Sequence, residues 1–280
     1  MSIRLLMKAL ERTPKNSRYI QPPPLSVGDL GNINAYPKGT TIVAVEYNDG
    51  IAMAADRIAT LPGGTVFSRD FVKLENVQEN AALAFCGNLA LAHDILKDFK
   101  DLCDRISSEI MRPISLDGKC SLLKSAARVN FTDIIWIKGS WDFGAILGGY
   151  DHVYGKAIYS FNAPLLLLHQ HDFWADGSGF DQARTFLHHN FQKNLNAAEA
   201  VALALGAIRA AGVFETSVSH PYGDPPPTVK LIDKNGIIDI SEKNLDEHRK
   251  EARKMEISFR NNTVTIKVKR TGAARERRSR

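Results

Sequence analysis

The pattern of apolar and polar residues changes abruptly at residue 40. From there, T-T-I-V-A-V-E-Y (Thr40–Tyr47) and G-I-A-M-A-A-D (Gly50–Asp56) are rich in strand-forming residues, and the N-D-G between them signals a hairpin turn. Both segments are apolar at nearly every position, which is typical of strands that are covered on both faces. The sequence therefore predicts a buried antiparallel hairpin at residues 40–56.

Beyond this hairpin, strands and helices are predicted in separate blocks. Helices are expected where apolar residues recur every three or four positions, and strands where short apolar runs end in turn residues. The predicted helices are Leu89–Ile110, Lys119–Trp136, Gly179–Phe191 and Ala197–Ala211. The predicted strands are Thr65–Ser68, Val72–Glu75, Ala81–Cys86, Phe143–Tyr150, Lys156–Tyr159, Pro164–His169, Phe173–Asp176, Thr228–Asp233 and Ile237–Ile240, and a last hairpin turns about Asn261–Asn262.

Blocks of strands separated by pairs of helices indicate the α+β class. An alternating βαβ order would instead indicate a parallel sheet. The simplest layered arrangement is two antiparallel sheets packed face to face, with a helix pair on each outer side. We therefore expect an αββα sandwich.

Residues 1–39 are expected to form a leader rather than a packed element. One weakly helical segment, Ile3–Glu11, is followed by a stretch that prolines interrupt. Charged residues break the apolar part of this segment, so it lacks the uninterrupted core of a secretory signal. The expected organisation is a leader at residues 1–39, a main domain at 40–255 and a C-terminal hairpin with a basic tail at 256–280.

Composition adds three constraints. The net charge of +5 is concentrated in a basic C-terminal tail, so general nucleic-acid binding by the main domain is not expected. No apolar run approaches the about 18 residues of a membrane span, so no membrane association is expected. The three cysteines have no CxxC spacing, which argues against a disulfide framework and for a reducing compartment. A cytoplasmic location is expected.

The sequence predicts neither a metal site nor a bound cofactor. The eight histidines include no HExxH or similar spacing. No Walker A or GxGxxG sequence is present, so any use of ATP would belong to a partner.

Thr40 is the first candidate for catalysis. A threonine hydroxyl is a weak nucleophile that needs a nearby base. Cleavage between Gly39 and Thr40 would free an α-amine with a pKa near 7.7–8.0, about right for a base at neutral pH. Gly39 has no side chain to hinder attack on its carbonyl. A Gly-Thr-Thr also simply begins many strands, so the tripeptide alone does not establish a nucleophile.

Three neighbouring positions strengthen this candidate. The predicted hairpin returns Asp56 to the side of Thr40. Lys73 is a lone lysine in an apolar segment, where lysine is rare unless it is paired, and its charge would lower the pKa of the Thr40 hydroxyl and amine. Gly87 lies where a strand gives way to a helix, so that backbone N–H groups there could receive an oxyanion. Each residue also has an ordinary structural explanation: a turn acid, a strand-edge lysine and a helix-start glycine.

Together these segments resemble the β subunit of the proteasome, and most closely the actinobacterial-type bacterial proteasome. The resemblance rests on G-T-T-I-V-A-V, A-A-D-R-I-A-T, S-R-D-F-V-K-L and F-C-G-N-L-A in this order, with D-G-S-G at Asp176–Gly179. It covers roughly Gly39 to Glu242. It implies an N-terminal nucleophile hydrolase of αββα fold, made as a proprotein and activated by self-cleavage between Gly39 and Thr40.

The resemblance also implies residue roles. Thr40 is the nucleophile, Lys73 and Asp56 support it, Gly87 donates to the oxyanion, and Ser178 belongs to the hydroxyl network around the nucleophile. The positions that match the specificity pocket of the family are Ala59, Thr60, Phe71, Phe85 and Leu89. Their largely apolar character suggests a preference for apolar residues at the cleaved bond.

The family's partners follow from the resemblance as well. It implies a β ring of seven copies, α-type ring subunits, an ATPase ring that feeds substrate, and unfolded polypeptides as substrates.

One region departs from the family pattern. The family's Asp-x-x-Ser, which supports the nucleophile, has no clean counterpart in V-F-E-T-S-V-S-H-P-Y-G-D. Glu215 with Ser217 or Ser219 is the candidate at shifted spacing, and Asp224 is a further candidate acid. Smaller departures are Ile58 in place of an arginine and one extra residue between Asp56 and Lys73.

Two alternatives share the predicted fold. One is the simpler HslV-type bacterial peptidase, whose chains generally lack a long leader and a C-terminal extension. The other is a non-catalytic structural ring subunit, against which Thr40, Asp56 and Lys73 argue. A nucleic-acid-binding protein would explain the basic tail and nothing else.

Overall fold

The first strands form the hairpin that the sequence predicts. Strand β1 (Thr41–Tyr47) pairs antiparallel with β2 (Gly50–Ala55), and the turn falls at Asn48 and Asp49. Every residue of the two strands is buried except Glu46, which is partly buried, because other layers cover both faces. The hairpin therefore lies at the centre of the molecule.

The computed structural model describes residues 40–60, 65–138, 143–151, 155–162, 165–214, 226–241, 245, 255–260 and 263–268. The predicted leader with its weak helix Ile3–Glu11, and the basic residues from 269 onward, lie outside these ranges.

Two five-stranded antiparallel sheets form the middle of the molecule. The first has the order β10-β1-β2-β11-β12 and the second the order β5-β6-β7-β8-β9. The first sheet adds β10 (Phe173–Gly177), β11 (Thr228–Asp233) and β12 (Gly236–Asp239) to the hairpin. The second consists of β5 (Leu74–Asn76), β6 (Ala81–Gly87), β7 (Phe143–Asp151), β8 (Gly155–Asn162) and β9 (Leu166–Gln170).

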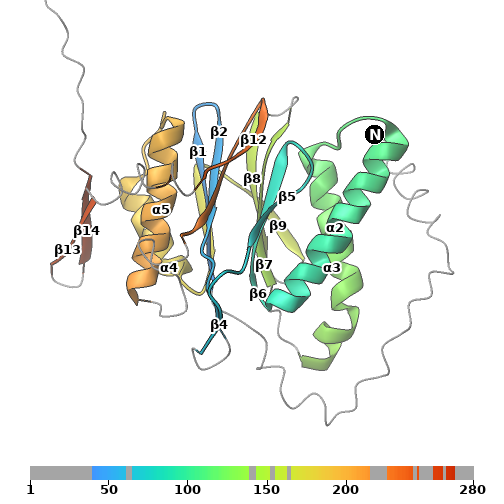
Figure 1. Ribbon diagram of the computed structural model, residues 1–280, viewed down its shortest axis with the longest axis horizontal. Helices are drawn as coiled ribbons and strands as arrows, with labels where there is room; N and C mark the ends of the chain where they lie inside the picture. Colours follow the sequence, from blue (N-terminus) through green and yellow to red (C-terminus); the bar gives the residue numbers. More distant parts are fainter. Residues whose placement is uncertain are drawn as a thin grey trace, which may run out of the picture.

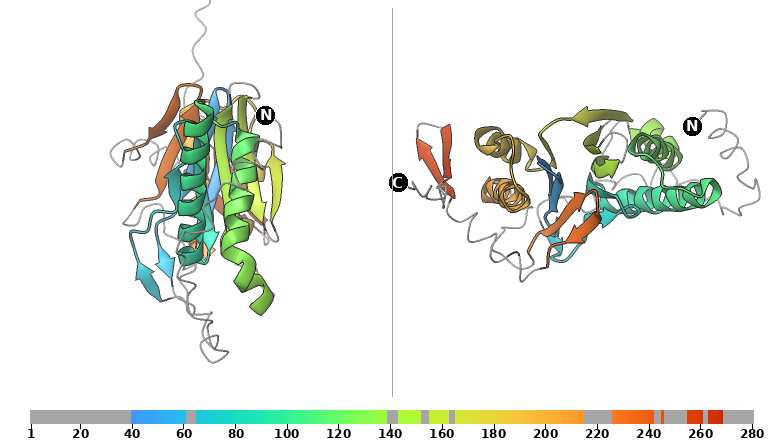
Figure 2. Two further views of the ribbon diagram at one scale, coloured as in Figure 1. Left: turned by 90° about the vertical axis from the view of Figure 1, so that its right-hand side faces the viewer. Right: turned by 90° about the horizontal axis from the view of Figure 1, so that it is seen from above.

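A helix pair covers the outer face of each sheet. Helices α2 (Leu89–Ile110) and α3 (Leu116–Lys138) cover the second sheet, and α4 (Phe180–Asn190) and α5 (Ala197–Phe214) cover the first (Figures 1 and 2). Three apolar clusters fill the spaces between the layers, and the middle one joins the two sheets through residues such as Ile42, Met53 and Ile146. The predicted αββα sandwich is confirmed.

Some element boundaries differ from the prediction. Helix α3 begins at Leu116 instead of Lys119, because the Ser115 hydroxyl accepts a hydrogen bond from the Gly118 N–H and caps the first turn. A two-residue strand, β3 (Ala59–Thr60), pairs with β4 (Val66–Ser68) and was not predicted. Lys73 lies just before β5 and not within it.

The C-terminal hairpin is present. Strand β13 (Met255–Arg260) pairs antiparallel with β14 (Thr263–Val268) as a separate two-stranded sheet. In the part of the chain that the structure describes, no helix is both long enough and apolar enough to cross a membrane.

Candidate active site

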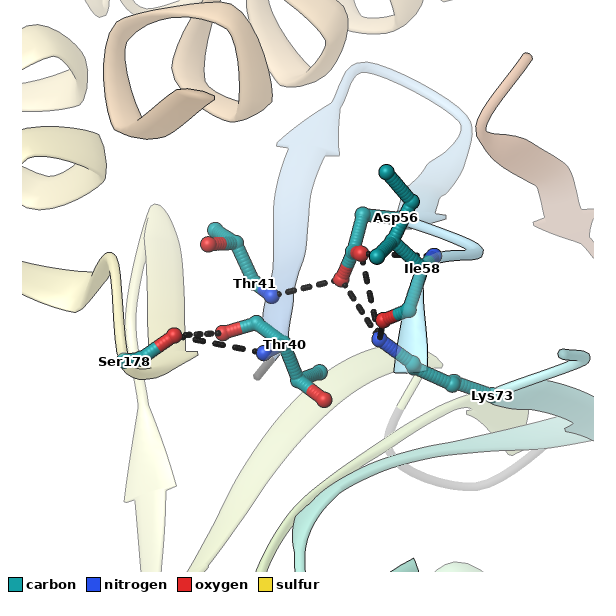
Figure 3. Close-up of polar contacts among 6 residues, drawn as sticks. All are labelled: Thr40, Thr41, Asp56, Ile58, Lys73 and Ser178. Atoms are coloured by element: carbon teal, nitrogen blue, oxygen red, sulfur yellow. Dashed lines mark hydrogen bonds and ion pairs between the residues drawn. The ribbon is translucent and has the colours of Figure 1, made fainter. Parts of the chain in front are cut away.

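Thr40 lies directly before β1, at the end of the first sheet, and the residue is 1% exposed. Its N–H donates a hydrogen bond to Ser178 Oγ, and the Ser178 hydroxyl donates to the Thr40 carbonyl oxygen, each at 3.2 Å. Ser178 belongs to the turn between β10 and α4. Because β10 pairs with β1, this turn is held against the start of β1 (Figure 3).

Asp56 and Lys73 lie on the other side of the same strand start. The Lys73 ammonium is 3.0 Å and 3.1 Å from the two carboxylate oxygens of Asp56, and it also donates to the Ile58 carbonyl oxygen. Asp56 Oδ1 accepts the Thr41 N–H at 2.7 Å, and Oδ2 accepts the Ile58 N–H at 3.0 Å. Figure 3 shows the two groups on either side of Thr40 and Thr41.

The hairpin register brings Asp56 to this position. Ile42 pairs with Ala55, the last residue of β2, so Asp56, which follows it, falls beside Thr41 at the head of β1. The Asp56 N–H donates to the Thr41 carbonyl oxygen at 3.1 Å, while the carboxylate accepts the Thr41 N–H. Asp56 is thus fixed by backbone and side chain together, as the hairpin in the sequence led us to expect.

Burial dominates the electrostatics of this pair, since both side chains are fully excluded from solvent. Burial raises the pKa of the Asp56 carboxyl, and the nearby Lys73 and the accepted hydrogen bonds oppose this shift. Burial likewise lowers the pKa of the Lys73 amine, which Asp56 opposes. The pair is stable as ions only because each partner compensates the other. Because its pKa is lowered, Lys73 loses its proton more readily than a lysine in water does.

Two glycines let the Ser178 turn approach β1 closely. Gly177 has a φ of +98°, and a Cβ at this position would lie 2.2 Å from the Thr40 carbonyl oxygen. A Cβ at Gly179 would lie 2.5 Å from Thr41 Oγ1. Both side chains would push the turn away, so the Gly-Ser-Gly sequence is required for the contact between Ser178 and Thr40.

Gly87 ends β6 with a φ of +93°, and Asn88 caps the following helix by accepting the Leu91 N–H at 3.2 Å. This is the strand-to-helix junction that the sequence predicts. A role for Gly87 in binding an oxyanion stays a prediction.

The predicted pocket residues lie in or beside one apolar cluster, which includes the buried face of α2. Ala59, Phe85 and Leu89 are members of it, Thr60 is buried beside Ala59 on β3, and Phe71 packs against it partly exposed. Only Phe71 presents appreciable surface. Their contact with substrate stays a prediction.

Other predicted residues lie outside the described ranges. These are Gly39 and the whole segment that contains Glu215, Ser217, Ser219 and Asp224. Among the residues that the structure does describe, no group of three or more His, Cys, Asp or Glu could hold a metal ion.

Sequence reasoning missed the backbone groups of the site. The Thr41 N–H holds Asp56 in place and the Ile58 carbonyl oxygen holds Lys73 in place. The side chains of Thr41 and Ile58 do not indicate this role of their backbone groups. The only signal is the hairpin register itself.

An αββα sandwich with a buried threonine at the head of its first strand is the arrangement of an N-terminal nucleophile hydrolase. Comparison with known proteins narrows this class. A family model described as proteasome subunit matches residues 36–219, about two thirds of the sequence. The chain therefore belongs to the proteasome subunit family, as its resemblance indicated.

Relatives that match most of the chain carry the same family name. A proteasome subunit beta of Jonesia denitrificans is 30% identical over 220 residues, which cover 75% of this chain and 69% of the relative. A proteasome subunit beta 2 of Thermomonospora curvata is 29% identical over 66% of this chain and 65% of its own length. A proteasome subunit beta of Natrialba magadii is 28% identical over 68% of this chain and 74% of its own length.

These relatives favour a β subunit of a proteasome core over the alternatives of the same fold. Membership of the family implies a peptidase that works in a multi-subunit ring assembly.

Proposed function

We propose that the chain is the proteolytic β subunit of a bacterial proteasome core, a threonine endopeptidase that is activated by removal of residues 1–39. The observation that carries this proposal is the position of Thr40. It is buried at the head of β1, between Ser178 on one side and the Asp56–Lys73 pair on the other.

Activation would begin at the bond between Gly39 and Thr40. The Thr40 hydroxyl attacks the Gly39 carbonyl carbon, its proton passes to the departing amide nitrogen, and the acyl group moves from nitrogen to oxygen. Water then hydrolyses the ester, which releases the leader with a Gly39 carboxylate. Thr40 is left with a free α-amine and its hydroxyl.

Substrate cleavage would use the same hydroxyl. The neutral α-amine of Thr40 accepts the hydroxyl proton as Oγ attacks the peptide carbonyl, and later donates it to the leaving amine, so that the acyl half of the substrate remains on Oγ as an ester. Water then hydrolyses this ester, which releases the acyl half as a carboxylate and restores the Thr40 hydroxyl. A charged Lys73 lowers the pKa of the Thr40 hydroxyl, and Asp56 holds Lys73 in place. The N–H of Gly87 is the proposed donor to the oxyanion. Ser178 holds the amine through the contact that now joins its Oγ to the Thr40 nitrogen.

We also propose how the subunits assemble and receive substrate. Seven copies would form a β ring beside α-type rings, and an ATPase ring would deliver unfolded polypeptides in the cytoplasm. This part of the proposal rests on the family resemblance.

The mass of the assembled protein tests the proposal. Purified particles should contain a chain that begins at Thr40 and should cleave fluorogenic peptides that carry an apolar residue before the cut. A wild-type particle that is active with its leader intact would contradict the proposed mechanism. A processed particle without any peptidase activity would instead support a structural subunit.

A further inference from the structure

Asp176, the last polar residue before the Ser178 turn, lies on the face of the first sheet that packs against the second sheet. It pairs with Ile42 in the β1–β10 register, and directly paired residues of antiparallel strands point to the same face. Ile42 belongs to the apolar cluster between the two sheets. A carboxylate therefore occupies the edge of an otherwise apolar layer, next to the start of β1.

The Asp176 carboxylate has partners on both of its oxygens. Oδ1 accepts the Gly177 N–H at 2.7 Å. With its nitrogen turned toward the carboxylate, the Asn162 amide donates to Oδ2 at 2.6 Å. A Cβ on Gly144 of β7 would lie 2.9 Å from Oδ2 and 2.8 Å from the Cys86 sulfur, so the space for this carboxylate depends on a glycine.

The surroundings of Asp176 contain few charges. Among the described residues, the elements packed around it contribute Arg184 from α4 as the charged group, together with the Cys86 thiol from β6. Burial raises the pKa of the Asp176 carboxyl, while the Gly177 N–H and the more distant Arg184 oppose the shift. Asp176 is partly buried, and the hydrogen bond from the Gly177 N–H offsets part of the cost of removing its carboxylate from water.

We propose that Asp176 is a positioning residue for the nucleophile. Its carboxylate holds the Gly177 N–H, and this fixes the turn that sets Ser178 Oγ at 3.2 Å from the Thr40 nitrogen. Gly177 links the two contacts, since it approaches Thr40 so closely that an added Cβ would meet the Thr40 carbonyl oxygen. The 215–219 segment has no clean counterpart of the family's supporting acid. Asp176 supplies such an acid from β10. The inference rests on the proposed function of Thr40.

The carboxylate acts through its charge as well as its shape. A hydrogen bond to an ionised acceptor is roughly twice as strong as one to a neutral acceptor. Asp176→Asn keeps an oxygen for the Gly177 N–H but removes the charge. Asp176→Ala removes both. The two variants therefore separate the charge from the mere presence of an acceptor.

The test uses the full chain in its assembled form. Leader removal is measured by intact mass, and kcat and KM of peptide hydrolysis are expressed per processed chain for the wild type, Asp176→Asn and Asp176→Ala. Asp181→Asn is the matched control, since Asp181 is an exposed acid in the first turn of α4. We expect Asp176→Ala to lower kcat by about ten- to a hundredfold with little change in KM, Asp176→Asn to lower it by less, and the control to behave as wild type.

The pH profile separates positioning from a general structural effect. In acid the wild-type carboxylate becomes protonated, so the ratio of wild-type kcat to Asp176→Asn kcat should fall toward one. The ratio cancels the titration of the Thr40 amine, which both proteins share. Equal kcat for wild type and Asp176→Ala, or equal losses in both variants that do not depend on pH, would overturn the proposal.

Three further variants serve as checks: Gly144→Ala, Glu215→Gln and Thr40→Ala. If Asp176→Ala fails to assemble, Gly144→Ala displaces Oδ2 and should lower kcat as well, and adding Asp176→Asn to it should cost less than the sum of the two single effects. Glu215→Gln is assayed in parallel. If only Glu215→Gln shows the acid-dependent ratio, the supporting acid is Glu215, and the assignment to Asp176 is wrong. Thr40→Ala checks the function separately: residual turnover there would refute the nucleophile, whatever Asp176 does.

Discussion

Lys73 and Asp56 form an ion pair in which neither side chain reaches solvent, and the same Asp56 oxygen that binds Lys73 also accepts the Thr41 N–H. The pair is thus built into the backbone at the head of β1. Removing one partner of a buried pair leaves an unpaired charge, which is more damaging than replacing both. This difference separates the contribution of the pair to stability from its contribution to catalysis.

Lys73→Met should abolish peptide hydrolysis and lower the free energy of unfolding by about 3–5 kcal/mol, because it leaves Asp56 charged and unpaired. The double variant Lys73→Met/Asp56→Asn should recover much of this stability without recovering activity. Denaturant unfolding and peptidase assays on chains that start at Thr40 measure both effects and avoid the need for processing.

Lys119→Met is the matched control for this experiment. Lys119 is also fully buried, and it donates to Asn80 and to the Ile114 carbonyl oxygen, far from Thr40 in the fold. The Lys119→Met variant should be less stable than the wild type but should keep the wild-type turnover per folded chain. Normal turnover in Lys73→Met would remove Lys73 from the mechanism.

Thr40→Ala should leave residues 1–39 attached and give no peptidase activity, because the attacking hydroxyl is absent. Thr40→Ser retains a hydroxyl and should still release the leader. Intact mass and N-terminal sequencing report both outcomes. A Thr40→Ala chain that begins at residue 40 would show that another agent removes the leader.

Gly177→Ala should slow both leader removal and peptide hydrolysis. The added Cβ would meet the Thr40 carbonyl oxygen at 2.2 Å, and a φ of +98° costs an L-residue about 1–2 kcal/mol. Gly155→Ala is the control, because Gly155 has a φ of +76° and nothing within 4 Å of an added Cβ. Both variants should lose stability, and only Gly177→Ala should lose turnover per folded chain. Equal turnover in the two would mean that the close approach is not needed.

Asp176→Asn should be more stable than the wild type at neutral pH. Burial raises the folded-state pKa of Asp176 above its ordinary 3.8. Between the ordinary and the raised pKa, the folded protein holds a proton that the unfolded chain has released. Stability from this group is therefore complete below the ordinary value and is lost as the pH rises through the raised one. The difference in unfolding midpoint between variant and wild type should vanish in acid. A constant difference at all pH values would contradict the raised pKa.

Cys103 and Cys120 should not react with a disulfide reagent at pH 8 while the protein is folded. Burial raises the pKa of each thiol to about 12, so almost no thiolate is present. Both should react in denaturant. Rapid labelling of either residue in intact particles would indicate that the space between α2 and α3 opens.

The sequence predicts the layers of this fold well because their signals are local. The N-D-G turn, the doubly apolar strands and the helical spacing of residues 89–110 each indicate one element without help from the rest of the chain. The start of α3 was placed too late because Gly118 suggested a loop, whereas Ser115 caps the helix through the Gly118 N–H. Strand β3 has only two residues, too few to carry a pattern.

The site is less predictable, because much of it is backbone. The order of Thr40, Asp56 and Lys73 in the sequence was enough to propose them as site residues. In the structure Asp56 and Lys73 form a pair beside Thr40. The roles of the Ile58 carbonyl oxygen and the Thr41 N–H follow only from the fold. In the sequence Asp176 is only the last residue of a predicted strand, and the pairing with Ile42 in the structure shows that it faces the space between the sheets.

The double burial of β1 and β2 has a consequence for how the chain finds its alignment. In a sheet with one wet face, a slip of one residue turns apolar side chains toward water and is penalised. Here both faces are dry, and Glu46 is the one acidic residue in β1, so a slipped hairpin would lose little apolar burial. The turn at Asn48–Asp49 and the bonds of Asp56 to Thr41 and Lys73 then favour the correct alignment, together with the pairing of β1 with β10 and of β2 with β11. The groups proposed for catalysis thus also help to decide which pairing of the central strands is the native one.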